Sequence, residues 1–267
     1  MSTKLLTALI FAASSFAAAI APNDAREQTV RIIAQIQRAD YEGDGVAMQR
    51  GYDELKPFID DQKLASRIRY WRGFAQWRRA INGFNDGVDR RELARNLNTA
   101  LDEFKAAIEL DPKFVDARIG IISSLGFLLF AEPQDEAGKK SRIEQILAMD
   151  KEARAIAPEN PRLIWVHGPI LWNSPPERGG GQDKAMQNYQ RGLEVCSKIK
   201  PSDDPLEPSW GKPELMMSLA YCHMNANSPD LNAAERYARS ALEIVPYWHY
   251  VRDILLPQIL TAKAQLQ

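Results

Sequence analysis

The stretch 67–79 holds the residues of this chain that are best suited to binding a charged ligand. Its arginines could act as a clamp, because a guanidinium group binds a carboxylate at two points. The candidate contact residues are Tyr70, Trp71, Arg72 and Arg79. The same spacing fits a helix that packs on both sides and leaves its arginines in solvent. We favour this second interpretation, because apolar residues at helical spacing are the commoner sign of a core.

A second cluster surrounds a Gly-Pro pair and consists of Trp165, His167, Trp172 and Asn173. Aromatic rings with a polar tip suit a ligand pocket, and a proline inside a helix frees backbone groups that could bind a ligand. A core segment with a kink explains the cluster at least as well. A lone histidine is also more often a satisfied core residue than a ligand-binding one. We keep these four as the remaining candidate binding residues.

The sequence contains no recognisable catalytic or metal-binding motif. Its three histidines, His167, His223 and His249, lack metal-ligand spacing. The acidic turn 40–45 begins like a calcium loop but lacks the glutamate that such a loop needs at its twelfth position. The glycine-rich stretch 179–183 lacks the lysine and the preceding strand of a phosphate loop. We therefore predict no catalytic residue, no metal and no cofactor.

Cys196 and Cys222 are the only two cysteines of the chain. One lies near the end of a predicted helix and the other inside the next. Antiparallel packing could bring their Cα atoms within the roughly 4.4–6.8 Å that a disulfide needs. Two buried free thiols, which behave as small apolar residues, are the alternative. The sequence leaves both open.

Residues 1–19 are typical of a secretory signal peptide, in which a lysine precedes an apolar run and small residues follow. Residues 20–267 would then form a single domain. An uncleaved anchor helix is the alternative, although the apolar run is short for a bilayer about 30 Å thick. No other stretch is apolar over the length that a membrane span needs. We therefore predict a periplasmic or secreted protein.

Composition and charge limit the class of partner. The chain has 267 residues, of which 45% are hydrophobic and 26% are charged, as in an ordinary soluble protein. Its formal net charge is −1, which gives no general attraction to nucleic acid or to an anionic membrane. Electrostatic binding would therefore need a local patch, and we predict no nucleic-acid partner.

Helical signals dominate the chain, and strand signals are almost absent. Apolar residues recur at helical spacing, and prolines, glycines and acidic caps mark the helix ends. Asp89 and Glu92 form a predicted capping box. Pro169 is expected to disturb its helix, and Pro257 to kink or split the last one. The predicted helices are 25–38, 46–58, 62–82, 89–110, 114–129, 135–156, 162–172, 183–198, 214–225, 232–244 and 247–264.

Four prolines divide the chain at nearly equal intervals. Pro112, Pro158, Pro201 and Pro246 lie 46, 43 and 45 residues apart. The segments that end at the first and the last of these prolines carry small or aromatic residues at the same spacing of 4, 3 and 5. Such a recurrence predicts stacked helical hairpins with a period of about 45 residues, and not a compact enzyme core.

The two segments resemble the second helix of the tetratricopeptide repeat (TPR). The resemblance rests on Ala100, Phe104 and 107–112, and on Ala234, Ala238, Ala241 and Pro246. In the third unit, Ala185 and Tyr189 keep the spacing of a small and an aromatic residue. Ile119–Gly120 and Tyr70–Gly73 are similar to the family's first helix. The segment before Pro158 matches poorly. The period exceeds the family's 34 residues because inserts such as 175–182 and 225–230 separate the two helices of a pair.

We therefore predict an all-α, right-handed TPR-like solenoid of about five antiparallel helix hairpins with long inserts. The resemblance implies a binding role, because exported TPR-like proteins include transporter-associated and envelope-assembly members. We expect a non-catalytic scaffold that binds a protein or peptide partner in the cell envelope through grooves lined by the first helix of each hairpin. The alternative is a small-molecule-binding accessory protein of a solute transporter, and an enzyme ranks last.

Overall fold

The structure is a computed structural model that describes residues 22–132 and 135–265, so the predicted signal peptide lies outside the described residues. Every regular element in these residues is helical. Short turns of 3₁₀ helix span Lys56–Phe58 and Pro176–Arg178, and a π-helical turn spans Tyr250–Leu255. The α-helices are α1 (Pro22–Glu42), α2 (Gly45–Glu54), α3 (Ala65–Asn85), α4 (Arg90–Leu110), α5 (Val115–Ala131), α6 (Glu136–Ile156), α7 (Pro161–Asn173), α8 (Gln182–Lys198), α9 (Lys212–Asn225), α10 (Leu231–Ile244) and α11 (Leu256–Ala264).

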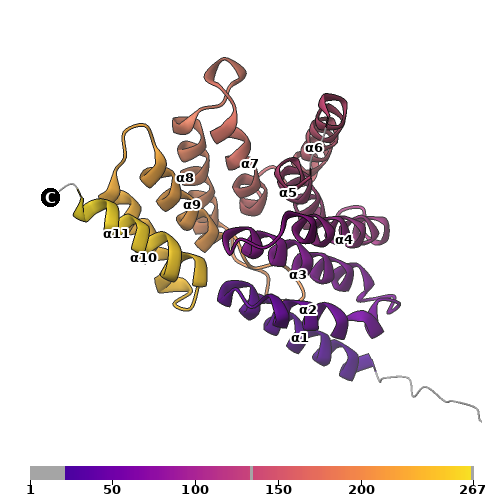
Figure 1. Ribbon diagram of the computed structural model, residues 1–267. Coiled ribbons are helices and arrows are strands. Elements are labelled where there is room, and N and C mark those ends of the chain that lie inside the picture. Colours follow the sequence, from indigo (N-terminus) through magenta and orange to yellow (C-terminus); the bar gives the residue numbers. More distant parts are fainter. Residues whose placement is uncertain (1–21, 133–134, 266–267) are drawn as a thin grey trace, which may run out of the picture.

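Consecutive helices pack in pairs, which form a fan of five hairpins followed by α11 (Figure 1). We call α3, α5, α7 and α9 the first helices, because each opens one of the four hairpins that follow the initial α1–α2 pair. Each first helix packs on the hairpin before it. In the case of α7 the contact is with α5 and not with α6, so that α5 is the main neighbour of α6. No helix in the described ranges is long and apolar enough to cross a membrane.

The helix ends largely follow the local signals of the sequence. Asp89 caps α4 by accepting from the amide of Arg91 at 3.0 Å, but Glu92 does not complete the predicted capping box. Its carboxylate accepts from Arg79 instead. Pro169 does not end its helix, because α7 continues through this residue to Asn173. The helix does not split at Pro257: a π-helical turn, Tyr250–Leu255, leads directly into α11.

Small residues of the first helices face aromatic residues of the second helices, as the repeat resemblance implies. Phe104 of α4 fills the space between two hairpins. A Cβ atom on Gly73 of α3 would lie 2.8 Å from its ring, and one on Gly120 of α5 would lie 2.4 Å from it. In the same way, a Cβ atom on Gly168 of α7 would lie 2.0 Å from the ring of Tyr189 of α8. Gly73 and Gly168 allow the two helices of one hairpin to approach closely, and Gly120 does the same for neighbouring hairpins.

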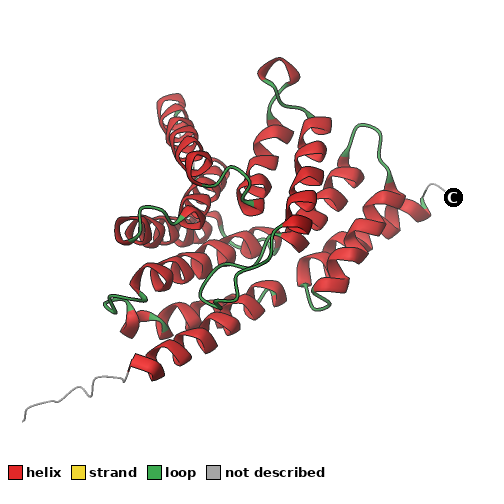
Figure 2. Ribbon diagram, turned by 180° about the vertical axis from the view of Figure 1, so that it is seen from behind, coloured by secondary structure: helices red, strands yellow, loops and turns green. Residues whose placement is uncertain are grey.

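The segment 199–211 between α8 and α9, which we call the linker, crosses the middle of the fan (Figure 2). The sequence reads as a polar, proline-rich connection, yet Leu206 and Trp210 are buried in the main core. Trp71 donates its indole N–H to the carbonyl of Leu206 at 2.8 Å. Trp210 donates to the Tyr70 hydroxyl at 2.9 Å. The linker therefore joins the two halves of the array through its centre.

The first hairpin also meets the end of the chain. The ring of Tyr41 packs edge-on against Trp248 with centroids 5.1 Å apart, and the guanidinium of Arg38 lies 3.5 Å above Tyr247. His249 packs against Gly43, whose φ of 72° puts it in the left-handed region. A Cβ on this glycine would lie 2.9 Å from the imidazole. These contacts hold α1 against the residues that precede α11.

A buried polar network lies beneath this contact. Arg78 donates to the Asp40 carboxylate at 2.8 Å, and Asn82 donates to the Asp40 carbonyl at 2.8 Å. Glu214 at the start of α9 accepts from the Tyr41 hydroxyl at 2.8 Å. Burial raises the pKa of Glu214, while the charge of Arg78 opposes that shift. Burial also lowers the pKa of Arg78, but Asp40 and Glu214 raise it by more.

We expect the contact between the chain ends to weaken as the pH rises. Hydrogen bonds from His249 to Asp253 and Asp86 raise its pKa, against partial desolvation. Arg252 and Glu42 are the other charges near this site. Because the pKa is raised in the folded state, protonated His249 stabilises the fold fully below the unfolded pKa of about 6.5. This stabilisation is lost as the pH rises above the folded pKa. Because His249 is 35% exposed, solvent screening keeps the effect under about 1 kcal/mol.

The check is the melting temperature of the unchanged protein and of His249→Gln, each measured at about pH 5.5 and about pH 8.5. At the lower pH, the unchanged protein should have the higher melting temperature. The difference in melting temperature between the two proteins should shrink at the higher pH. An equal difference at both values would show that the charge of His249 does not contribute.

Candidate functional site

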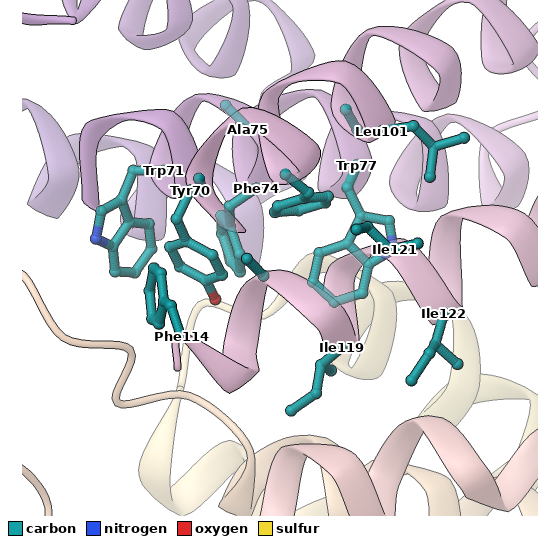
Figure 3. Packing of buried hydrophobic residues seen from close by; sticks show 14 of the residues in the cluster. Tyr70, Trp71, Phe74, Ala75, Trp77, Leu101, Phe114, Ile119, Ile121 and Ile122 are labelled. Carbon is teal, nitrogen blue, oxygen red and sulfur yellow. The ribbon is translucent and has the colours of Figure 1, made fainter. Parts of the chain in front are cut away.

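Four aromatic residues of α3 form the centre of the core (Figure 3). Tyr70, Trp71 and Trp77 are 0% exposed, and Phe74 is 1% exposed. Tyr70 packs on Phe114 with ring centroids 5.0 Å apart. Two of the sequence-predicted contact residues, Tyr70 and Trp71, therefore have no surface that a partner could touch. Their polar tips bind the linker instead.

Arg72 is also buried, so neither interpretation of it from the sequence describes its surroundings. Its Nε donates to the Glu103 carboxylate at 2.8 Å, and Nη1 donates to the carbonyl of Tyr52. Its guanidinium lies 3.8 Å above the Tyr52 ring. Arg69 donates to the other oxygen of Glu103 at 2.9 Å. Arg72 is therefore neither solvated nor free to hold a ligand carboxylate.

Arg79 is the partly exposed member of the first candidate group, at 27%. It borders a wide, shallow hollow of about 600 Å³ between α2 and α3, which is also lined by Val46 and Arg50. Its two terminal nitrogens donate to Gln49 and Glu92, each at 3.0 Å. Together with a longer bond from Nη1 to Asn96, these contacts use three of the five N–H donors of Arg79. The other arginines of the stretch that bind carboxylates are Arg67, Arg69, Arg72 and Arg78.

The second candidate group divides between two sides of α7. Trp165 faces α9, where its indole N–H donates to the Ser218 hydroxyl at 2.9 Å. His167 faces α6 and lies 3.8 Å from the carboxylate of Asp150. Burial lowers the pKa of His167, and the charge of Arg154 lowers it further. His167 therefore lies on a different side of α7 from Trp165, with which the sequence grouped it.

The other two members of this group lie at the end of α7. Asn173 is exposed and donates to the carbonyl of Pro169 at 2.8 Å. Trp172 is half-buried and packs edge-on against Tyr221 of α9, with centroids 6.4 Å apart. These two residues, unlike His167, lie where a partner of the first helices could reach them.

The first helices run parallel and in register, as contacts near their beginnings and middles show. Near the beginnings, Asp116 of α5 binds Arg162 of α7, and Arg162 donates to the carbonyl of Trp210 at 3.2 Å. In the middle, Trp77 of α3 donates to the Ser123 hydroxyl of α5 at 3.1 Å. The linker covers the first helices both near their beginnings and in their middles, because the Trp210 ring packs on Trp77 and Trp165.

The ends of the first helices carry partly exposed rings in two groups, one on α3 and α5 and one on α7 and α9. Phe84 of α3 packs on Phe127 of α5 at 6.2 Å, as Trp172 packs on Tyr221. Phe84 is 52% exposed, Phe130 is 66% exposed and Tyr221 is 42% exposed. We call these five residues, Phe84, Phe127, Phe130, Trp172 and Tyr221, the aromatic face.

The sequence interpretation missed Phe84, Phe130 and Tyr221, although part of the signal was present. Phe84 lies seven residues after Trp77, and Trp172 lies seven residues after Trp165. Seven residues are close to two helical turns, so each pair lies on one face of its helix. The earlier ring of each pair thus predicts the direction of the later one. The exposure of the later ring depends on where the linker ends, which no spacing shows.

The two cysteines are free thiols in the structure, which is the second alternative that the sequence left open. Both lie in or against the small core formed by α7, α8 and α9. Burial raises the pKa of Cys222 to about 12 and also raises the pKa of Cys196. Their thiolate forms are therefore disfavoured. Among residues 22–132 and 135–265, no three His, Cys, Asp or Glu side chains gather as a metal site would require.

Comparison with known proteins shows the fold and no closer relationship. No family model matches the chain, and no curated protein matches it. A thermophilic TPR protein from Thermus thermophilus is 19% identical, with a TM-score of 0.54 over 91% of this chain and 100% of that one. The HusA haemophore from Porphyromonas gingivalis is 16% identical, with a TM-score of 0.58 over 75% of this chain and 94% of that one. The predicted TPR-like, all-α solenoid is thereby confirmed.

Proposed function

We propose that this chain is an exported, non-catalytic scaffold that binds a segment of a protein partner in the cell envelope. The observation that carries the proposal is the aromatic face, whose rings are partly exposed at the ends of α3, α5, α7 and α9. Phe84, Phe130 and Tyr221 are among the exposed large hydrophobic residues of the fold. Exposed apolar residues gathered from several elements are typical of an interaction site, unlike single exposed residues scattered over a surface.

The linker explains why the binding site would occupy one end of the first helices. In the expected arrangement, the inner side of the first helices would be open along its length. Here Trp210 and Leu206 already fill the beginnings and middles, so a partner meets only the final turns. Aromatic side chains at such a site supply large contact areas at a small cost in side-chain entropy.

The test uses a peptide library displayed against the unchanged protein and against two variants. In the face variant, Phe84, Phe130 and Tyr221 are replaced by Ser. In the control variant, three exposed apolar residues outside the aromatic face, Val46, Leu110 and Ile199, are replaced by Ser. We expect peptides enriched on the unchanged protein to bind the face variant at least about tenfold more weakly. The control variant should bind them unchanged.

Both variants should keep the melting temperature, because all six residues are exposed. A library that yields no binder would count against the proposal, as would peptides that bind the two variants equally well. The proposed export has a separate check, which is the N-terminal residue of the protein recovered from its own host. Cleavage after residue 19 is the expected result, and an intact N-terminus in the cytoplasm would contradict it.

A second candidate function is the binding of a planar small molecule. It is favoured by the structural similarity to a haemophore and by the rings of the aromatic face. A flat ring system could stack on Phe84 or Tyr221 as well as a peptide side chain could. Titration with haemin tests it: a shifted Soret band that the face variant loses would support this function. A spectrum that stays that of free haemin would exclude haemin as the ligand.

A further inference from the structure

The helix α6 is packed on one side only. Each of α4, α8 and α10 packs on the helix before it and on the helix after it, whereas α6 packs on α5 and has no comparable contact with α7. In both ribbon views α6 projects away from α7 (Figure 1 and Figure 2). One side of α6 is therefore left without the neighbour that the other hairpins provide.

The two helices meet near the turn that joins them, and this contact is incomplete. Asp150 of α6 accepts from Nε of Arg154 at 2.7 Å and lies 3.8 Å from Nδ1 of His167 on α7. Nη2 of Arg154 and Nδ1 of His167 are buried without a hydrogen-bond partner among the described residues. Because most buried polar atoms in folded proteins are paired, α7 does not complete the packing of α6 even here.

The side of α6 that faces α7 carries two exposed aliphatic residues. Ile143 and Leu147 precede Asp150 and Arg154 at spacings of 4, 3 and 4, so all four lie along one stripe of the helix. Ile143 is 46% exposed and Leu147 is 60% exposed. Within the described residues, α4, α8 and α10 expose large apolar side chains only at their ends, if at all. An aliphatic pair exposed within a helix therefore sets α6 apart.

The unpaired charge beside this stripe is positive. Lys151 is exposed and forms no ion pair with any residue that the structure describes. Arg154 compensates Asp150, and Lys140 lies 4.0 Å from Glu144, at the outer limit of an ion pair. The helix on the other side of the stripe, α7, contains no acidic residue. An acidic partner would therefore meet a free lysine and only carboxylates that already have a basic neighbour.

We propose that Ile143, Leu147 and Lys151, which we call the α6 patch, bind a helix of a partner protein that carries aliphatic residues along one side and acidic residues beside them. Elsewhere in the array a helix packs on this side of the second helix, so a helix fits the uncovered side of α6. Its aliphatic side chains would recur at the spacing of Ile143 and Leu147 and would pack between them. Its acidic side chains would pair with Lys151. The α6 patch shares no residue with the aromatic face.

The test compares two designed helical peptides of about 25 residues, a length at which an isolated helix can form in water. Both carry the same stripe of leucines, and they differ only in having Glu or Lys beside it. Each is titrated against the full protein by fluorescence anisotropy at low and at high salt. We expect the Glu helix to bind at least about tenfold more tightly, with an advantage that shrinks as salt rises.

Variants of the protein locate the binding. Replacing both Ile143 and Leu147 with Ser should weaken the Glu helix at least about tenfold. Lys151→Glu should weaken it several-fold, whereas Lys105→Glu should leave it unchanged, because Lys105 is an exposed lysine of α4 that likewise forms no ion pair within the described ranges. All these side chains are exposed, so the melting temperature should be kept. The face variant should bind the Glu helix like the unchanged protein.

Several results would overturn the proposal. Equal or tighter binding of the Lys helix would do so, as would binding of the Glu helix that survives the Ile143 and Leu147 substitutions. Binding that only the face variant loses would place the helix on the aromatic face instead. Analytical ultracentrifugation of the protein alone should show a monomer. A dimer that the Ile143 and Leu147 substitutions dissociate would assign the α6 patch to a second copy of this chain and would also overturn the proposal.

Discussion

Replacing Arg78 with Met is expected to lower the free energy of unfolding by about 3–5 kcal/mol. Arg78 is 3% exposed, and its nearest carboxylate, Asp40, is 2% exposed. Glu214, which is 0% exposed, adds a second buried acid to the same network. Methionine would fill much of the space but would leave both acids without a positive charge. The loss should therefore far exceed that of a surface ion pair.

Denaturant unfolding measures this effect, and Arg31→Met is the matched control. Arg31 pairs with Glu27 on α1, but both side chains are well exposed, at 64% and 72%. The control should change the free energy of unfolding by less than about 0.5 kcal/mol. Adding Asp40→Asn to the Arg78 variant should recover part of its loss, because one unpaired buried acid is removed. A loss below about 1 kcal/mol for Arg78→Met would show that the network does not hold α1, α3 and α9 together.

The second large effect is expected for Trp210→Ala, at about 3–5 kcal/mol. The Trp210 ring packs against Trp77 and Trp165 with centroids 5.6 Å from each, and its indole N–H donates to the Tyr70 hydroxyl. Alanine would leave a cavity in the centre of the fan and would leave the buried hydroxyl without this donor. The linker should then detach from α3.

Trp210→Phe separates packing from hydrogen bonding, because the ring remains while the donor is lost. It should cost about 1–2 kcal/mol, well below the loss for alanine. Limited proteolysis gives an independent readout: the alanine variant should be cleaved in the linker 199–211 faster than the unchanged protein. Equal cleavage rates and a loss under about 1 kcal/mol would mean that the linker does not close the inner side.

The hairpin architecture could be predicted from the sequence because its signals are local. A proline or an acidic cap acts on the residues beside it, so the helix predicted over 89–110 is found at Arg90–Leu110. Small residues facing an aromatic residue are also a local pattern, which Phe104 shows with Gly73 and Gly120. The fold class follows from these patterns once they recur along the chain.

The arginines show where local patterns stop being informative. Periodicity places Arg72 beside the apolar stripe of α3, but it cannot show that Glu103 lies 31 residues away and 2.8 Å from its Nε. The linker is a similar case. Its prolines and charges indicate a solvated loop, and only the tertiary structure shows that Trp210 is a core residue. The proposed site therefore lies at the ends of the first helices and not at the arginines of α3.

Hydrogen exchange of the protein with and without a library-selected peptide tests the central claim most directly. Bound peptide should slow exchange in the last turns of α3, α5, α7 and α9, where the aromatic face lies. Exchange in the hollow beside Arg79 should stay unchanged. Protection that appears around Arg79 and is absent from those four helix ends would contradict the account.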